Sequence, residues 1–370
     1  MDFREEFENN WRDFQVVNKG KVVPTIMILG ISGAGKSSLI NDIFGGDIAK
    51  VSDVMPMTEG FKIYKGSDYG RNINLIDSAG YEINQGNTYC DSIKDIVDHG
   101  IDGVDVQALW YCLPIVNKRI EEMDIENINC LCESGKIKGR LCIVLTKCDE
   151  DTEDGEIARS FKEIIKRSCK DNIQCFETST SNEINDPLQM DELINWSASV
   201  IDDEDIRDMF ISAQMKNLNV KKKSANQIIN QSSIASAAVG ATPIPFSDAA
   251  LLVPIQVRMV SKIIDIYGVT GLASISTALV GDVIITQIGK SIVGGILKCF
   301  PIIGAAAGGA INAAVATGIT FAIGQAVSEI CYNSVNKYMN GEEVYWDKLF
   351  DDELLMGLIQ KYLNLNNLEN

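Results

Sequence analysis

The sequence predicts two domains of different class, an α/β domain with a mostly parallel sheet and helices on both faces, followed by an all-α domain. From residue 21 to about 205, short apolar runs alternate with polar runs that suit helices. This alternation is typical of a parallel sheet covered by helices. Beyond it, long helical runs rich in Ala, Gly, Ile and Val replace the strand pattern. A length of 370 residues also favours two domains.

The apolar runs give the elements in order. Aromatic residues at helical spacing in residues 1–17 predict a short amphipathic helix that docks on the C-terminal half in preference to a membrane. Strands are predicted at residues 22–29, 61–65, 73–76, 106–113, 140–145 and 173–177. The short turn at 66–70 makes the second and third of these antiparallel. We therefore expect an N-terminal helix at 1–17, an α/β domain at 18–205 and a helical domain at 206–370.

Composition limits the classes of partner and the cellular compartment that we expect. A formal net charge of −18 repels phosphate backbones and anionic lipid, so we expect no nucleic-acid partner. The ten cysteines are scattered and His99 is the single histidine, which argues against a His/Cys metal site. We expect no signal peptide, and free thiols then predict a cytoplasmic location.

A glycine-rich segment follows the first predicted strand and precedes a run that suits a helix. It matches the pattern G-x-x-x-x-G-K-[ST] in full. Glycines let the backbone wrap closely around phosphate, and N–H groups at a helix N-terminus stabilise negative charge. We expect Lys36 to reach the β- and γ-phosphates and Ser37 to bind Mg²⁺. The residues expected at the nucleotide phosphates are Gly30, Ser32, Gly33, Ala34, Gly35, Lys36, Ser37 and Ser38.

Two further motifs follow in the order that a guanine-nucleotide site requires. Asp77-Ser78-Ala79-Gly80 ends a strand, where Asp77 suits the Mg²⁺ side and the Gly80 N–H can sense a γ-phosphate. Thr146-Lys147-Cys148-Asp149 also follows a strand and matches [NT]-K-x-D. Asp149 can accept hydrogen bonds from guanine N1–H and N2–H₂, whereas adenine would leave it unpaired. The stem of Lys147 can pack along the base.

The complete set resembles an Era-like, translation-factor-type P-loop GTPase domain. Ser179, after the last strand, resembles the loop position whose backbone contacts guanine O6. Met55-Pro56-Met57-Thr58 resembles switch I of Era-like and dynamin-related GTPases, which implies that Thr58 completes Mg²⁺ coordination; an ordinary strand-entry threonine is the alternative. The resemblance thus implies GTP or GDP as ligand. Catalytic roles fall to Lys36, Ser37, Thr58 and Gly80, and Mg²⁺ ligation to Ser37, Thr58 and Asp77.

One position departs from the small-GTPase pattern. Tyr81 stands where many of these proteins have a glutamine that orients the attacking water. GTPases with this position substituted tend to hydrolyse slowly alone and to need a partner, a dimer or another residue. We therefore expect a low intrinsic rate and name no water-positioning residue.

The second half resembles a helical domain of unknown function that accompanies Era-like GTPases, through Pro243-Ile244-Pro245, Gln256, Tyr267-Gly268, Thr320 and Gly324 among others. The layout is also similar to immunity-related GTPases, which act at membranes. Residues 299–328 carry no charge and are long enough to span a bilayer, which needs about 20 residues. Two stripes at four-residue steps run through them. The bulky stripe is Ile311, Val315, Ile319, Ile323 and Val327, and the small-residue stripe is Gly304, Gly308, Asn312, Ala316, Thr320 and Gly324. Because polar residues within this run need partners, we favour a soluble bundle helix over a membrane-inserting hairpin.

Three functional hypotheses follow. The first is an enzyme that hydrolyses GTP and couples the nucleotide state to a rearrangement of a helical domain that associates with membrane or with other protomers, as a homodimer or oligomer. The second is a GTP-switched protein-binding module with negligible hydrolysis. The third is a membrane-embedded channel or transporter-like protein gated by GTP, with residues 271–328 as its spans. It is the least favoured, because Asp282 and Lys290 interrupt the apolar stretch. We expect a cytoplasmic protein, peripheral at a membrane under the first hypothesis.

Overall fold

The computed structural model describes residues 22–45, 55–57, 61–66, 73–78, 86–100, 105–151, 154–181, 188–215, 217–240, 248–269 and 313–366. These fall into two compact units, one within residues 22–220 and one from residue 221 onward. The helix expected at 1–17 lies outside the described residues. The division lies later than the boundary at 205 expected from sequence, because α8 (Glu204–Ala213) belongs to the first unit, where its Phe210 packs edge-on against Phe44.

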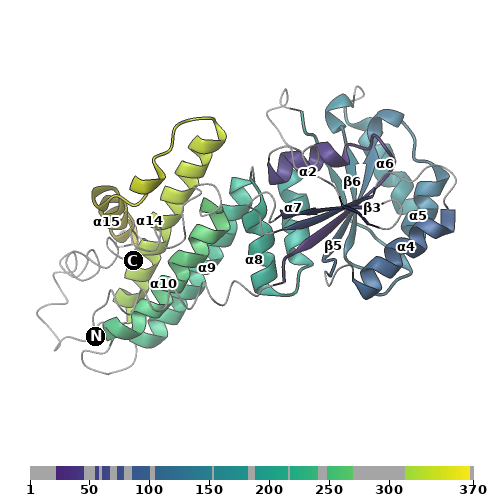
Figure 1. Cartoon of the computed structure of the whole chain (residues 1–370). Helices are drawn as coiled ribbons and strands as arrows, with labels where there is room; N and C mark the ends of the chain where they lie inside the picture. Colours follow the sequence, from purple (N-terminus) through teal and green to yellow (C-terminus); the bar gives the residue numbers. More distant parts are fainter. Residues whose placement is uncertain are drawn as a thin grey trace, which may run out of the picture. The chain divides into compact units, whose positions relative to one another are not determined.

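The first unit is built on a sheet of seven strands in the order β2-β3-β4-β1-β5-β6-β7 (Figure 1). Pairings β2–β3 and β3–β4 are antiparallel and the others are parallel, which confirms the predicted mostly parallel sheet. The short strand β2 is not predicted from sequence, since three residues carry no readable pattern. The strands are β1 (Thr25–Leu29), β2 (Met55–Met57), β3 (Phe61–Lys65), β4 (Asn74–Ser78), β5 (Ala108–Pro114), β6 (Leu141–Thr146) and β7 (Cys175–Glu177).

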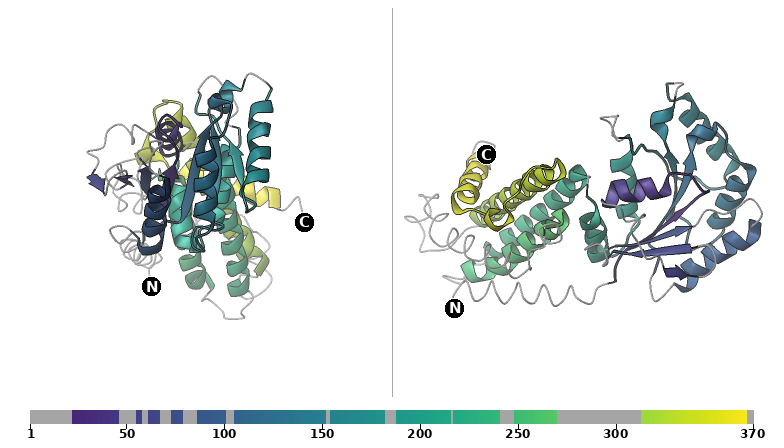
Figure 2. Two further views of the ribbon diagram at one scale, coloured as in Figure 1. Left: turned by 90° about the vertical axis from the view of Figure 1, so that its right-hand side faces the viewer. Right: turned by 45° about the horizontal axis from the view of Figure 1, so that its top comes forward.

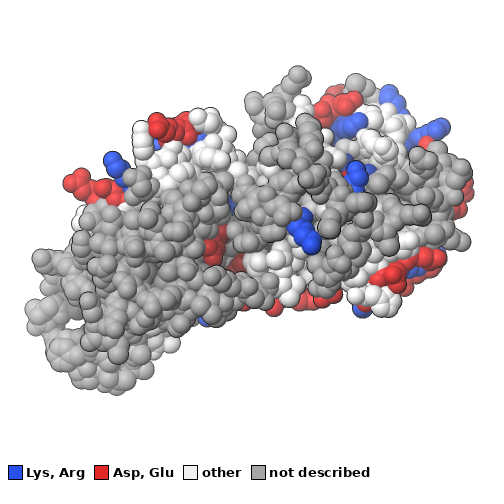
Figure 3. Space-filling model, in the orientation of Figure 1, with Lys and Arg blue, Asp and Glu red and all other residues white. Residues whose placement is uncertain are grey.

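Helices cover both faces of this sheet, which is why its central strands are buried throughout and mostly apolar. On one face Met27, Leu29 and their neighbours form a core with α4 (Gly86–His99), α5 (Glu122–Cys132) and α6 (Glu156–Ser168). On the other face Phe44 of α2 (Lys36–Phe44) stacks on Trp110, whose indole donates to Ser197 of α7 (Met190–Ser199). Acidic and basic side chains are mixed over the described surface in view (Figure 3).

A disulfide corrects one sequence-based expectation. Cys90 of α4 is bonded to Cys130 of α5, whereas all thiols were expected to be free. The two residues are 40 positions apart, and only the side-by-side packing of the two helices brings them together. The other described cysteines are free.

The second unit is helical. It contains α9 (Leu218–Gly240) from residue 221 onward, α10 (Asp248–Tyr267), α14 (Ala313–Met339) and α15 (Asp352–Asn366), and two views show α9, α10 and α14 alongside one another (Figure 2). A Cβ at Gly324 of α14 would lie 2.7 Å from Ile229 Cγ1 and 3.0 Å from Met259 Sδ. The small-residue stripe of α14 therefore lets α9 and α10 approach closely.

The polar residues of α14 have partners inside this bundle. Thr320 Oγ1 donates to Ser236 Oγ at 2.9 Å and accepts from Gln256 Nε2 at 3.2 Å, while Gln325 Nε2 donates to Asn226 Oδ1 at 3.1 Å. Within the described ranges, α14 is the one helix long and apolar enough to cross a membrane, and 67% of its most apolar stretch is buried. A buried core helix meets the same criteria. Residues 299–312 of the uncharged run lie outside the described residues.

Candidate nucleotide-binding site

The predicted site residues gather where the parallel strands end. Strands β1, β4, β5, β6 and β7 all run in the same direction. Their C-terminal ends therefore share one edge of the sheet, where ligands bind in open α/β folds. The loops that follow β1, β6 and β7 and the end of β4 carry the residues singled out from the sequence. Thr58, Gly80 and Tyr81 lie outside the described residues, so their predicted roles stay predictions.

The loop after β1 has backbone geometry that only glycine can supply. Gly30 has a φ of 131°, and a Cβ there would lie 2.5 Å from the carbonyl oxygen of Cys112. Gly35 has a φ of 82° and immediately precedes α2. Ser32, Gly33, Ser37 and Ser38 are exposed, whereas Ala34 is buried. The N-terminus of α2 is thus open toward a ligand, as an anion site requires.

The side chain of Lys36, the first residue of α2, reaches back into this loop. Its Nζ donates to the carbonyls of Gly30 at 2.9 Å and Ile31 at 3.0 Å, and the residue is buried. The Nζ also lies 4.0 Å from Asp77 Oδ1. The loop therefore holds an ammonium group beside an acid, which is the arrangement needed to bind an anionic phosphate and a divalent cation together.

Asp77, at the end of β4, fits a Mg²⁺ ligand. It is buried, and its Oδ1 has no hydrogen-bond partner within the described structure. Burial raises the pKa of this carboxyl to about 6, although Lys36 and Lys62 act to lower it. A buried carboxylate oxygen without a hydrogen-bond partner, next to a phosphate loop, is the group that a bound Mg²⁺ would satisfy.

The base-reading end of the site is also organised by hydrogen bonds. Asp149 is exposed, and its Oδ1 accepts from the Ser179 hydroxyl at 2.8 Å. The Ser179 Oγ also accepts from the Ser181 N–H at 3.0 Å, so the hydroxyl is held from both sides. The sequence assigned Ser179 a backbone contact with the base. The structure adds a side-chain role, in which Ser179 orients the Asp149 carboxylate.

Thr146 joins the two ends of the site. Its Oγ1 donates to the Ala34 carbonyl at 2.7 Å, and its side chain would contact a Cβ at Gly35. The sequence places Thr146 in the [NT]-K-x-D motif but predicts no contact for it. Its signal is a polar residue at the end of the apolar strand β6. Tyr89 of α4 was also missed: its hydroxyl donates to Ser78 Oγ at 3.1 Å, and nothing local in the sequence points to that bond.

Comparison with known families agrees with this geometry. Residues 25–147 match the family described as 50S ribosome-binding GTPase. This part of the chain is a P-loop GTPase domain. Residues 205–344 match a domain of unknown function, DUF697. Both matches confirm the predicted GTPase domain and the helical domain of unknown function. The finer resemblances, to Era-like, dynamin-related and immunity-related GTPases, stay predictions.

No curated protein matches the chain. Among solved structures, a bacterial selenocysteine-specific elongation factor, EF-Sec, is 19% identical with a TM-score of 0.33, covering 49% of this chain and 29% of its own. Toc33 from Arabidopsis thaliana, in complex with Mg²⁺ and GMPPNP, is 17% identical with a TM-score of 0.34, covering 56% of this chain and 92% of its own. Toc33 with GDP and Mg²⁺ is 19% identical with a TM-score of 0.33, covering 56% and 91%.

Proposed function

We propose that the chain hydrolyses GTP to GDP and phosphate with Mg²⁺, and couples its nucleotide state to a rearrangement of the helical unit. The observation that carries the proposal is the hydrogen bond from Thr146 to Ala34. It connects the loop that reads the base, through Asp149, with the loop that holds Lys36. One nucleotide can therefore be bound at both ends by a single connected site.

Each residue of the site has a distinct task in this proposal. Lys36 and the N–H groups of its loop bind the phosphates, and Asp149, oriented by Ser179, accepts from the guanine edge. Asp77 and Ser37 would hold Mg²⁺ together with Thr58, and the ion would neutralise charge that develops on the phosphate oxygens. Because Tyr81 stands at the usual glutamine position, we propose a low intrinsic rate.

The helical unit is the proposed output. The chain would be cytoplasmic and would associate, in its GTP state, with a membrane surface or with other copies of itself. The uncharged run at 299–328 supports this proposal. Thr320 and Gln325 of α14 form hydrogen bonds within the bundle. If α14 were exposed to lipid, other partners would have to replace these bonds. The alternative is a GTP-switched protein-binding module, which Tyr81 favours.

The test is phosphate release from GTP by protein purified without detergent, at several protein concentrations and with or without liposomes. Lys36→Ala is the blank, because it removes the ammonium group from the phosphate loop. Turnover that rises with protein concentration or with lipid supports the coupled GTPase. Slow turnover that is unchanged by both would reject the coupling and favour the protein-binding module. Equal rates for the wild type and Lys36→Ala would reject hydrolysis at this site.

A further inference from the structure

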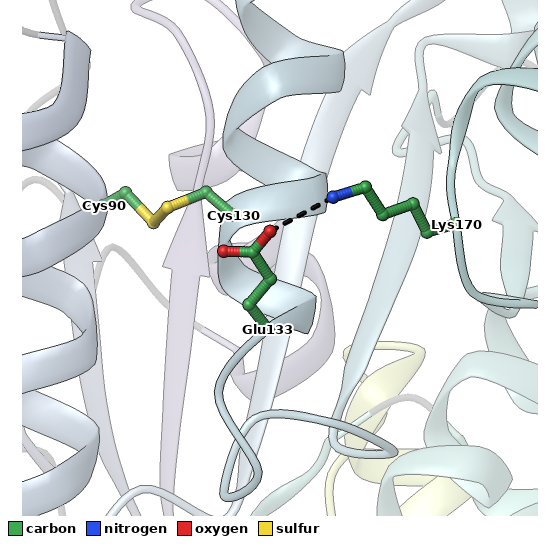
Figure 4. Close-up of a disulfide and its surroundings, with 4 residues drawn as sticks. All are labelled: Cys90, Cys130, Glu133 and Lys170. Carbon is green, nitrogen blue, oxygen red and sulfur yellow. Dashed lines mark hydrogen bonds and ion pairs between the residues drawn. A yellow bond between two sulfur atoms is a disulfide. The ribbon is translucent and has the colours of Figure 1, made fainter.

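The disulfide between α4 and α5 is not used by the proposed reaction, but Cys90 directly follows Tyr89, which contacts Ser78 beside Asp77. Cys90 is on the first half of α4, and Cys130 is near the end of α5 (Figure 4). Among the described elements, α4 is the first helix after the Asp77 motif, and residues 79–85 separate it from β4 in the sequence. A covalent bond therefore ties this helix to another part of the domain.

Helix α5 is held in place by contacts on both sides of Cys130. Asn129, beside Cys130, donates from Nδ2 to the Ser168 carbonyl at 3.1 Å and accepts from the Lys170 N–H at 2.9 Å. One turn on, Glu133 forms an ion pair with Lys170 at 3.1 Å (Figure 4). Contacts on both sides of Cys130 thus hold this end of α5 against the segment that follows α6.

Helix α4 connects the disulfide to the nucleotide site through Tyr89. The Tyr89 hydroxyl donates to Ser78 Oγ at 3.1 Å, and Ser78 follows Asp77 directly. The Tyr89 ring also stacks on Phe61 of β3, with ring centroids 6.3 Å apart. Because Cys90 is the next residue, the disulfide restrains the same helical turn that contacts the Asp77 motif.

We propose that Cys90 and Cys130 form a redox switch in which the disulfide holds α4 against α5 and thereby slows GTP turnover. The inference rests on the proposed GTP hydrolysis. In GTPases the segments around the nucleotide rearrange as the γ-phosphate binds and leaves. A helix that is covalently held beside the Asp77 motif opposes that rearrangement. Breaking the disulfide leaves α4 attached through non-covalent contacts alone, so the rearrangement costs less.

The exchange reaction balances with a dithiol as the reductant. One thiolate of the dithiol attacks Cys130 Sγ, which belongs to a half-buried residue, whereas Cys90 is 1% exposed. The Cys90–Cys130 bond breaks, Cys90 leaves as a thiolate and takes up a proton, and a mixed disulfide forms on Cys130. The second thiol of the dithiol then displaces Cys130. Two electrons and two protons pass to the protein, and the dithiol becomes a disulfide.

The experiment compares the full chain in two states, oxidised in air and reduced with dithiothreitol. The state of Cys90 and Cys130 is fixed by alkylation and mass spectrometry. Hydrogen exchange of residues 86–99 and the rate of phosphate release from GTP are then measured on the same samples. We expect the reduced protein to turn over GTP at least about fivefold faster, the low end of typical coupling between sites. Exchange in α4 should also be faster after reduction.

Two variants separate the switch from general effects of the thiols. Cys130→Ser should hydrolyse at the reduced rate and should not respond to dithiothreitol. Cys169→Ser removes a half-buried free thiol of the same unit, and its response should match the wild type.

Three outcomes would contradict either the redox switch or the proposed hydrolysis. Equal rates in both states, with the disulfide verified, would overturn the switch. So would alkylation of both Cys90 and Cys130 in the air-oxidised protein. If neither state turns over GTP while exchange in α4 still depends on the disulfide, the proposed hydrolysis fails and the restraint of α4 stands.

Discussion

At the scale of single residues, the site depends on a few polar groups placed at the ends of apolar strands. Thr146 ends β6 and Asp77 lies near the end of β4, and both are buried. The motifs mark these positions in the sequence because the chemistry of phosphate, metal and guanine demands those residue types. They do not give the bond from Thr146 to Ala34, which joins residues 112 positions apart. Contacts of that range follow only from the fold.

Replacing Thr146 tests whether the two ends of the site are connected. Thr146→Val keeps the shape of the side chain but leaves the buried Ala34 carbonyl without this donor, which typically costs about 1–3 kcal/mol. We expect the affinity for a fluorescent GTP analogue to fall about tenfold. Thr317→Val removes a similar hydroxyl-to-carbonyl bond, from Thr317 to Ala313 on α14, and should leave the affinity unchanged. Wild-type affinity in Thr146→Val would contradict the connection.

Asp77 makes the stability of the nucleotide-free protein depend on pH. Burial raises the pKa of its carboxyl from 3.8 to about 6. Because the folded-state pKa is raised, the stabilising effect of protonation is complete below pH 4 and is lost as pH rises through 6. Near pH 7 the buried carboxylate then costs about 3 kcal/mol, at roughly 1.4 kcal/mol per pKa unit.

The variant Asp77→Asn removes this cost and the predicted Mg²⁺ ligand together. We expect its free energy of unfolding without Mg²⁺ to exceed that of the wild type by about 2–3 kcal/mol at pH 7, and by roughly half as much at pH 5. Urea denaturation with a chelator at both pH values measures the difference. Asp98→Asn, at an exposed site on α4, should show no such dependence. A loss of stability in Asp77→Asn at pH 7 would contradict the assignment.

At the scale of elements, the sequence predicts the strands and helices whose apolar residues recur at a regular spacing. It does not predict features that have no such pattern. Every predicted strand is present, and the two stripes of α14 are buried where the structure describes them. Strand β2 is too short to show a period. The Cys90–Cys130 bond was missed because it depends on how α4 packs against α5, which neither helix encodes alone.

Two glycines of α14 test its packing against α9 and α10. A Cβ at Gly324 would lie 2.7 Å from Ile229 Cγ1, whereas a Cβ at Gly318 meets nothing within 4 Å. Gly318→Ala should stabilise the helical unit by about 0.5–1 kcal/mol through helix propensity. Gly324→Ala should destabilise it by about 1–2 kcal/mol, because overpacking outweighs that gain. Thermal unfolding should therefore show midpoints that move in opposite directions. Shifts of the same sign would contradict close packing at Gly324.

At the scale of the whole molecule, both domain classes could be predicted because each has its own periodicity. The match to the second domain begins at residue 205, at the predicted boundary, whereas the compact units divide after residue 220. Helix α8 has the same helical pattern as the second half of the chain. Its Phe210 nevertheless packs on Phe44 of the GTPase unit, a contact that no local pattern reveals. The order of the phosphate and guanine motifs along the chain predicted the GTPase domain. The proposed output of the helical unit would depend on a second state of the molecule, which motifs do not describe.

The most direct test of the guanine-nucleotide site is equilibrium binding of GTP and XTP to the wild type and to Asp149→Asn. Guanine presents N–H donors to the Asp149 carboxylate, whereas xanthine carries a carbonyl oxygen in place of the amino group. The wild type should bind GTP and reject XTP. In Asp149→Asn the affinity for GTP should fall and the affinity for XTP should rise, each by at least about a hundredfold. Unchanged GTP binding in Asp149→Asn would contradict the placement of the base beside Asp149 and Ser179.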